Sequence, residues 1–499
     1  MAGSDAERLA ADAVVIGTGA GGGPAAAVLA EAGLEVVLLE AGPRVAASGF
    51  VPDEALSRTR LGRIASSVDG LQSFYAGACV GGSTVVNDAL CWRPPAEVLE
   101  AWRREHALGA AADALPAYAE RVWRDVHAEP TDRAHRNRNA EALRRGARRL
   151  GWASEAMPRN VRGCANLGRC NFGCPIDAKQ SSLVAWVPRA ERAGARVLAD
   201  VRALRIRVEA GRVRGVDAMR LDPETREPTA PLRVDAPLVC VAAGVLESGP
   251  LLRRSGIADA RAGRGFQAHS SAYLTARFPE PIHAYFGPTM GHAVSEFSDV
   301  NGHAGPGYML ENTAVHPMQT AAVLPGFGAS HARAMAALPH LAHAVVVLRD
   351  RTRGVAAPGE DPASPRIDYA LEDADLARMR HAFASAARLY LASGAEEVWL
   401  PLEGYGPVRS ERDLERLPGV ALDRTRLSLL YAVHLFGGAN MHGRRAEGVC
   451  DPEGACWDVD GLFVADASSL PGNTGVNPQI TIMAHALRVA EAALARRHA

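Results

Sequence analysis

The chain has 499 residues, of which 48% are hydrophobic, and a formal net charge of -1. This length exceeds one ordinary core, so we expect two domains or one large elaborated fold, and the balanced charge argues against binding to nucleic acid or to an acidic surface. The sequence has no run of eighteen apolar residues and no amino-terminal signal, so we expect no transmembrane segment and a cytoplasmic location. Eight cysteines in a chain this long do not indicate a disulfide scaffold.

Residues 12–42 predict a strand, a glycine-rich turn, a helix and a second strand. The apolar run 13–16 is followed by Gly17, Gly19 and Gly22 in G-x-G-x-x-G spacing, and an alanine-rich helical pattern begins at once. Gly17 permits a tight turn, Gly19 lets the backbone approach a pyrophosphate, and Gly22 lets the helix pack against the strand. The N–H groups at the helix start would then face the phosphates. This pattern predicts dinucleotide binding.

The second strand, 36–39, ends at Glu40. An acidic residue at this place accepts hydrogen bonds from the adenosine ribose hydroxyls and repels a 2′-phosphate. The expected cofactor is therefore NAD or FAD rather than NADP.

A second glycine-rich segment spans residues 71–95. Gly81 and Gly82 permit a flat backbone beside a planar or phosphorylated ligand, and Ser83 and Thr84 can form hydrogen bonds to it. A surface Ω-loop is the alternative interpretation. Residues 96–160 then carry arginine-rich helical patterns, which predict a helical insertion away from the cofactor.

The segment 163–182 contains Cys164, Cys170 and Cys174 close together, and Lys179, the only lysine of the chain. A structural loop is the favoured interpretation, and the open alternatives are an iron–sulfur cluster, zinc with a fourth ligand, or a disulfide. We expect Lys179 to anchor the loop by pairing with a buried carbonyl or carboxylate where the fork of an arginine is too large.

Further strands follow over 197–208, with a turn near Gly211 and a return strand through residue 216, and the apolar run 237–243 restores the parallel sheet. The cofactor domain is therefore discontinuous. We expect an α/β fold in which residues 8–95, 190–268 and 435–499 form a Rossmann-like domain. Residues 96–189 and 269–434 would form a helical insertion and an α+β substrate domain on an antiparallel sheet.

The final stretch predicts a short strand over 462–465 that leads to Asp466, then a glycine-rich turn and a long helix. Asn477 suits the N-cap of this helix and Pro478 suits its first position. The apolar positions of the helix recur at helical spacing, so we expect one face in a core.

These segments, in this order, resemble the glucose-methanol-choline (GMC) oxidoreductases, FAD enzymes that oxidise alcohols. The matching stretches are GTGAGGG with Glu40, GACVGGSTVVN at 77–87, AAGVLESGPLLRRSGI at 242–257, and HLFGGANMHG through GVNPQITIMAHALRVAE at 434–491. The resemblance covers nearly the whole chain. Its closing segment is more similar to the cholesterol oxidase and long-chain alcohol oxidase branches than to glucose oxidase, which has a second histidine at the asparagine position.

The resemblance implies a catalytic pair, His434 and Asn477, facing the flavin. It implies that Asp466 holds the ribityl chain and that FAD is bound without a covalent link, because Val86 stands where some relatives carry a linking histidine. Asp88 departs from the glycine that is common after Asn87. The implied cofactor-binding residues are Gly17, Gly19, Ala20, Gly22, Glu40, Gly81, Gly82, Ser83, Asn87, Val201, Ala243, Asp466, Asn477 and Pro478.

Alcohol oxidation needs a base beside the hydroxyl, and a histidine near neutral pKa suits that role. We expect His434 to take the proton and Asn477 to hold the substrate oxygen. Glu311 is a less favoured second base, His442 is ambiguous, and His485 is expected to be structural. The expected substrate is an apolar alcohol, with oxygen or another electron acceptor. The alternatives are a lyase, isomerase or photoenzyme on the same scaffold, and an electron-transferring dehydrogenase subunit with an iron–sulfur cluster.

Overall fold

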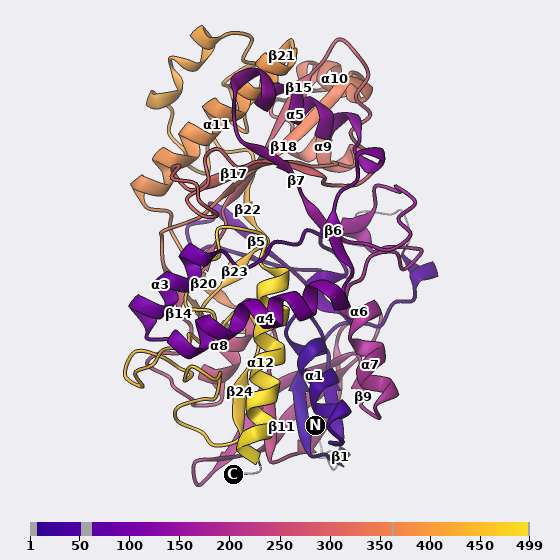
Figure 1. Ribbon diagram of the computed structural model, residues 1–499, viewed down its shortest axis with the longest axis vertical. Coiled ribbons are helices and arrows are strands. Elements are labelled where there is room, and N and C mark those ends of the chain that lie inside the picture. The colour runs from indigo at the N-terminus through magenta and orange to yellow at the C-terminus, as the bar shows by residue number, and fades with distance from the viewer. Residues whose placement is uncertain (1–6, 51–61, 362–363, 498–499) are drawn as a thin grey trace.

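The computed structural model describes residues 7–50, 62–361 and 364–497. In Figure 1 both chain ends lie at the bottom of the view, beside a parallel sheet and its helices, and a large, mainly antiparallel sheet fills the upper half. The fold class expected from the sequence, a parallel cofactor-binding sheet joined to an antiparallel one, is confirmed.

The parallel sheet has five strands in the order β24, β13, β2, β3, β9. The predicted strands 13–16 and 36–39 are present with those bounds, and the three other strands come from distant parts of the chain. The discontinuity expected from the sequence is therefore real. The bounds are β2 Ala13–Ile16, β3 Val36–Leu39, β9 Arg196–Leu198, β13 Leu238–Val241 and β24 Leu462–Val464.

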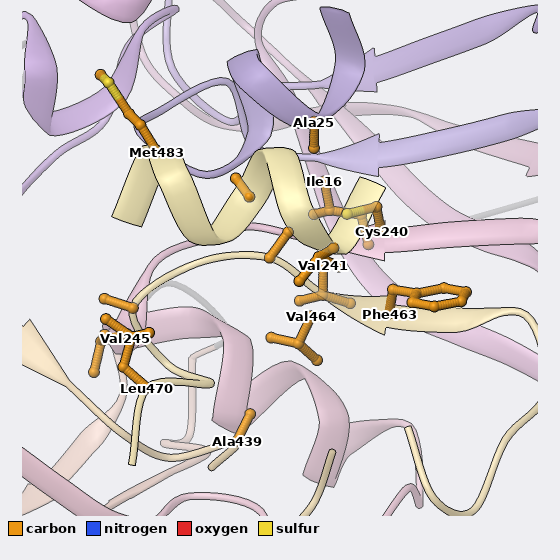
Figure 2. Close-up of a cluster of buried hydrophobic side chains, with 14 of the residues drawn as sticks. Ile16, Ala25, Cys240, Val241, Val245, Ala439, Phe463, Val464, Leu470 and Met483 are labelled. Carbon is orange, nitrogen blue, oxygen red and sulfur yellow. The ribbon is translucent and has the colours of Figure 1, made fainter. Parts of the chain in front are cut away.

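Helices α1 (Gly22–Glu31) and α12 (Gln479–Arg497) pack together over this sheet. Figure 2 shows α12 beside the ends of the neighbouring strands, with Ile16, Val241 and Val464 in the shared core. These side chains are at most 4% exposed. Burial of each such side chain stabilises the fold by about 1.5–3 kcal/mol. The core therefore holds the ends of these strands in place.

The run 197–208, expected as strand throughout, is interrupted. Its first part belongs to β9 in the parallel sheet, and after Asp200, whose φ is +55°, the chain continues as β10 in a second sheet. That sheet has the order β1, β12, β11, β10. Its bounds are β1 Glu7–Ala10, β10 Val201–Glu209, β11 Arg212–Leu221 and β12 Pro228–Asp235.

The largest sheet has the path β4, β5, β22, β15, β18, β17, β16, β7, and β21 pairs with β15. Helices α5 (Arg138–Leu150) and α11 (Asp373–Ser393) pack on it. Its bounds are β4 Gly62–Ser66, β5 Gln72–Gly77, β7 Ser154–Ala156, β15 Ser271–Arg277, β16 His292–Val294, β17 Tyr308–Asn312, β18 Leu341–Leu348, β21 Glu397–Trp399 and β22 Leu430–Ala432.

Strands β4 and β5, from the expected cofactor domain, therefore share a sheet with the expected substrate domain, and the exact domain boundaries stay a prediction. A smaller sheet has the order β20, β19, β14, β23, and β6 pairs with β8. The bounds are β6 Ala128–Pro130, β8 Pro158–Asn160, β14 Arg264–Ala268, β19 Gly354–Ala357, β20 Arg366–Asp368 and β23 Leu435–Phe436.

The expected helical insertion contains α3 and α4. Helix α4 crosses in front of α12 in Figure 1 and packs on it. Among the described residues, no helix combines the length and the apolar character needed to cross a membrane. The other α-helices of the described residues are α3 Ala96–His106, α4 Gly109–Asp125, α6 Ser182–Ala185, α7 Val187–Arg192, α8 Val245–Arg254, α9 Pro317–Val323 and α10 Ala329–Ala336.

Candidate functional site

A cavity of about 800 Å³ opens where the strands of the parallel sheet end. Ligands bind at this edge of open α/β sheets, and the volume lies in the range of small-molecule and cofactor sites. Most of the residues predicted to bind the cofactor line this cavity: Gly17, Gly19, Ala20, Glu40, Gly82, Ser83, Val201, Ala243, Asp466 and Pro478, together with His434. Gly22, Gly81, Asn87 and Asn477 do not line it.

The glycines at the turn are required by close backbone contacts. A Cβ atom on Gly17 would lie 2.2 Å from the carbonyl oxygen of Ala242, and one on Gly22 would lie 1.9 Å from that of Gly17. A Cβ on Gly82 would lie 2.8 Å from the Cα of Gly19. The two glycine-rich segments therefore form one narrow wall of backbone, which a side chain at either segment would obstruct.

Glu40 is buried where β3 ends, and it lines the cavity. Its Oε2 accepts hydrogen bonds from the N–H (3.1 Å) and Oγ1 (2.6 Å) of Thr18, and its Oε1 accepts one from the N–H of Gly42 (3.0 Å). Burial raises the pKa of Glu40, and these hydrogen bonds oppose the rise. A carboxylate accepts about four hydrogen bonds, so Oε1 retains capacity for a ligand hydroxyl.

Asp466 is held rigidly at the end of β24. Its Oδ2 accepts hydrogen bonds from the N–H of Gly244 (2.7 Å) and the hydroxyl of Ser248 (2.6 Å), and its Oδ1 accepts two from Ser468. The carboxylate thus ties the turn after β13 to the turn after β24. The carboxylate oxygens of Asp466 already accept hydrogen bonds within the protein. Asp466 therefore acts on a bound ligand mainly through its negative charge.

Two histidines and an asparagine meet at the His434 side of the cavity. His434 is half-buried and lines the cavity, whereas His269 is completely buried behind it. The two Nδ1 atoms are 3.2 Å apart, and Nε2 of His434 is 3.4 Å from the amide nitrogen of Asn477. Burial lowers the pKa of His434 to about 4 and that of His269 well below its usual range. Both rings are therefore neutral at pH 7.

Asn477 does not cap α12 as expected. The helix begins at Gln479, and the buried Oδ1 of Asn477 accepts no hydrogen bond. The segment before the helix instead turns this amide toward His434. Asn477 and His434 therefore come together as expected, although they are 43 residues apart in sequence.

Glu311 on β17 is fully buried, in contrast to the exposed position that is usual for glutamate. Glu311 does not line the cavity, and its carboxylate oxygens accept no hydrogen bond of normal geometry, although the amide N–H of Asn477 lies close enough to act on them. Burial raises its pKa to about 8; the nearby amide of Asn477 offsets part of that rise, and the charge of Asp88 adds to it. Asp88 is the residue that departs from the family pattern, so this departure bears on the electrostatics of Glu311.

Asn87 and the cysteine loop play structural parts in the observed contacts. The amide of Asn87 donates to Gln479 at the start of α12 (2.8 Å), and its oxygen accepts from the N–H of Ala89. Lys179 is buried, and its Nζ donates to the carbonyl oxygens of Val85 (2.6 Å), Asn87 (2.8 Å) and Cys170 (2.6 Å). The expectation that Lys179 pairs with buried carbonyls is confirmed, and it joins the cysteine loop to the cofactor segment.

The three loop cysteines are free thiols. Cys170 accepts a hydrogen bond from Arg159 at 3.2 Å, and Cys164 lies 3.8 Å from Asn166. Within the described part of the chain, no three histidine, cysteine or acidic side chains are grouped closely enough to hold a metal ion. The structural-loop interpretation of the three cysteines stays a prediction.

His442 and His485 lie outside the cavity lining. His442 accepts the N–H of Arg444 at 3.0 Å and pairs with Glu447, and His485 is 2.7 Å from the hydroxyl of Ser469 in the core. His269 is one of the residues that sequence reasoning missed. It stands alone among small and polar residues, so no local spacing distinguishes it from an ordinary core histidine.

Known proteins resemble this chain over most of its length. Residues 21–271 and 353–486 match two family models, both described as GMC oxidoreductase. An uncharacterised GMC-type oxidoreductase of Mycobacterium tuberculosis is 35% identical, with 97% of this chain and 76% of the relative covered. One from Sinorhizobium fredii is 32% identical (98% and 95% covered), and a long-chain-alcohol oxidase of Arabidopsis thaliana is 29% identical (97% and 67% covered).

Solved structures resemble the fold at low sequence identity. Pyridoxine 4-oxidase from Mesorbium loti has a TM-score of 0.68 at 19% identity, with 96% of this chain and 98% of that chain covered. Formate oxidase of Aspergillus oryzae, described in a study of its FAD modification, has a TM-score of 0.73 at 16% identity, with 99% and 100% covered. At these identities the likeness concerns the fold alone.

Proposed function

Since the chain belongs to the GMC oxidoreductases, FAD enzymes that act on CH–OH groups, we propose that it oxidises an apolar alcohol to the carbonyl compound. The observation that carries the proposal is the meeting of His434 and Asn477 beside the cavity that the glycine turn and Glu40 also line. A histidine and an amide side by side suit the two tasks of the reaction, which are binding the hydroxyl oxygen and controlling its proton.

The cavity fits FAD on three observations. Gly19 and Gly82 leave a backbone surface that a single Cβ would obstruct, and α1 begins beside it with N–H groups suited to a pyrophosphate. Glu40 retains acceptor capacity for ribose hydroxyls. We propose that these residues and Ser83, Val201, Ala243 and Asp466 hold the cofactor, and that Val86 leaves it without a covalent link. When bound, FAD accepts the hydride that leaves the alcohol carbon.

The chain offers two acceptors for the hydroxyl proton. His434 is neutral because burial lowers its pKa to about 4, so its free nitrogen can accept a proton, but it is a weaker base than the near-neutral histidine expected from the sequence. Glu311, which lies near Asn477 and behind the cavity lining, is the second candidate, because a buried carboxylate is a strong proton acceptor once it is ionised. In either case Asn477 would hold the substrate oxygen, and the protein acts chiefly by positioning.

An apolar substrate is supported by apolar side chains of the cavity. Val433, Leu435, Ile482 and Tyr75 contribute to its lining, and Val433, next to His434 in sequence, is 47% exposed. Such surface favours a ligand that also loses apolar area to water. The likeness to long-chain-alcohol oxidases points the same way. We further propose oxygen or another electron acceptor as the oxidant of the reduced flavin, and the cytoplasm as the location.

The test is anaerobic mixing of the purified flavoprotein with an alcohol series of increasing chain length, followed by admission of air. We expect bleaching of the flavin that is faster for longer chains, and prompt recovery in air. Recovery only with an added acceptor would identify a dehydrogenase. The absence of bleaching by every alcohol would refute alcohol oxidation and favour lyase, isomerase or light-driven chemistry. His434→Gln should slow bleaching by at least about a hundredfold while FAD remains bound, and His442→Gln serves as the matched control outside the cavity.

A further inference from the structure

His269 has a contact that fixes which of its nitrogens carries hydrogen. The backbone N–H of Gly475 donates to Nε2 of His269 at 3.1 Å. A backbone N–H can only donate, so Nε2 must present its lone pair. His269 is neutral because it is fully buried, faces His434 and lies near the positive charge of Arg349. A neutral imidazole carries one hydrogen, and in His269 that hydrogen is therefore on Nδ1.

The same reasoning extends to His434. Its Nδ1 lies 3.2 Å from Nδ1 of His269, so one of the two atoms donates and the other accepts. Because Nδ1 of His269 carries the hydrogen, Nδ1 of His434 accepts it. The hydrogen of neutral His434 is then on Nε2, the nitrogen that faces Asn477.

The orphaned atom of Asn477 agrees with this arrangement. An N–H on His434 cannot bond to the amide nitrogen of Asn477, which also donates, whereas the Oδ1 of Asn477 is buried without a partner. A half-turn of the amide brings that oxygen toward Nε2 of His434, where it can accept the hydrogen, and moves the amide N–H that acts on Glu311 away from that carboxyl group. Nitrogen and oxygen positions of an amide are assigned from such networks.

We propose that His269 is a positioning residue that, anchored by Gly475, holds His434 in the tautomer with hydrogen on Nε2. His434 then donates a hydrogen bond to the substrate oxygen, and the hydroxyl proton passes to the other candidate acceptor, the carboxylate of Glu311. The inference rests on the proposed function, and it selects Glu311 rather than His434 as the general base. In this step the O–H bond of the alcohol breaks, its proton joins a carboxylate oxygen of Glu311, and the alcohol carbon is oxidised by loss of hydride to FAD.

The opposite tautomer has a definite cost in this structure. If His434 carried its hydrogen on Nδ1, Nδ1 of His269 would have to accept, and the hydrogen of His269 would move to Nε2. That hydrogen would point at the N–H of Gly475, which is buried and would lose its acceptor. Loss of a buried hydrogen bond typically costs about 1–3 kcal/mol, which corresponds to roughly a 5- to 150-fold preference for the proposed tautomer.

The direct test is solid-state NMR of the FAD-loaded protein labelled with ring-15N histidine, without substrate. We expect a protonated Nε2 and an unprotonated Nδ1 for His434, and the reverse for His269. His434→Gln and His269→Asn assign the signals. Neutron diffraction of deuterium-exchanged wild-type crystals gives the same answer without any variant. Hydrogen on Nε2 of His269 by either method would overturn the proposal, whatever the outcome of the alcohol series.

A second test compares two substitutions. His269→Asn keeps an N–H that can donate to His434, whereas His269→Phe removes it and frees both tautomers of His434. We expect His269→Asn to retain the rise of kcat/KM with pH that reflects Glu311. His269→Phe should lose it, because His434 can then accept the proton, and should tolerate Glu311→Gln at least about tenfold better than the wild-type protein does. Equal pH profiles of kcat/KM for the two His269 variants would refute the role of the donated hydrogen. His343→Asn, a substitution at another buried histidine, controls for the loss of packing.

Discussion

Replacement of Glu311 by glutamine separates a functional carboxylate from a structural one. A carboxyl group buried without a hydrogen-bond partner destabilises the fold whenever it must ionise. The burial of Glu311 raises its pKa from 4.5 to about 8. Its contribution to stability is therefore fully present below pH 4.5, where the group is protonated in both the folded and unfolded states, and it is lost as the pH rises toward 8.

The size of this effect follows from the two pKa values. Between pH 4.5 and pH 7 the unfolded chain releases the proton and the folded chain retains it, so the wild-type protein should lose about 3 kcal/mol relative to Glu311→Gln. The cost of burying the amide of the variant does not depend on pH and cancels from this difference. In a chain of this size the change should move the two midpoints of thermal unfolding apart by roughly 3 °C.

The assay is thermal unfolding of the wild-type protein and Glu311→Gln in parallel from pH 4.5 to pH 8. Glu129→Gln, at an exposed glutamate on β6, is the matched control. Its midpoint of thermal unfolding should change with pH in the same way as that of the wild-type protein. We expect Glu311→Gln to gain stability relative to the wild-type protein as the pH rises, while it loses alcohol oxidation by at least about a hundredfold. Midpoints that stay a constant distance apart would refute the raised pKa, and full activity in the variant would refute the role as proton acceptor.

Three further predictions concern the cofactor segment and its support. Gly82→Ala places a methyl group against the glycine turn at a residue whose φ is +55°, so it should weaken FAD retention at least about tenfold, whereas Gly419→Ala, with open space around it, should not; flavin released on gel filtration measures both. Lys179→Arg cannot fit the three carbonyls that bind Nζ and should lower the midpoint of thermal unfolding together with FAD content; unchanged values would contradict the anchoring role. Asp88→Asn removes a charge that raises the pKa of Glu311, so the rise of kcat/KM should move to lower pH, and an unmoved profile would count against Glu311 as the base.

Much of the cofactor half of the fold could be predicted from the sequence because its signals are local. The strand 13–16, the glycine spacing and Glu40 lie within one stretch, residues 13–40, and each has a geometric reason that needs no distant contact. Lys179 was also informative by itself, because a single lysine in an arginine-rich chain suggests a site that the larger side chain cannot occupy.

The tautomer-setting contact could not be predicted in this way. His269 meets His434 across 165 residues and Gly475 across 206 residues, and only the folded sheets bring these positions together. Asn477 showed the opposite difficulty, because its local pattern suited a helix cap, whereas the tertiary contact with His434 determines its orientation. The break at Asp200 between β9 and β10 could not be predicted either, because the residues on both sides of it have the sequence pattern of a strand.

The strand order of the parallel sheet also constrains biosynthesis. β13 lies between β2, near the start of the chain, and β24, which is translated more than 200 residues after β13. At about 5–20 residues per second, the ribosome makes the first four strands of this sheet at least about 10 s before β24. Until then one edge of the sheet and the face that α12 covers are open. We therefore expect the nascent chain to need chaperone protection over this interval and to capture its nucleotide only after translation is nearly finished.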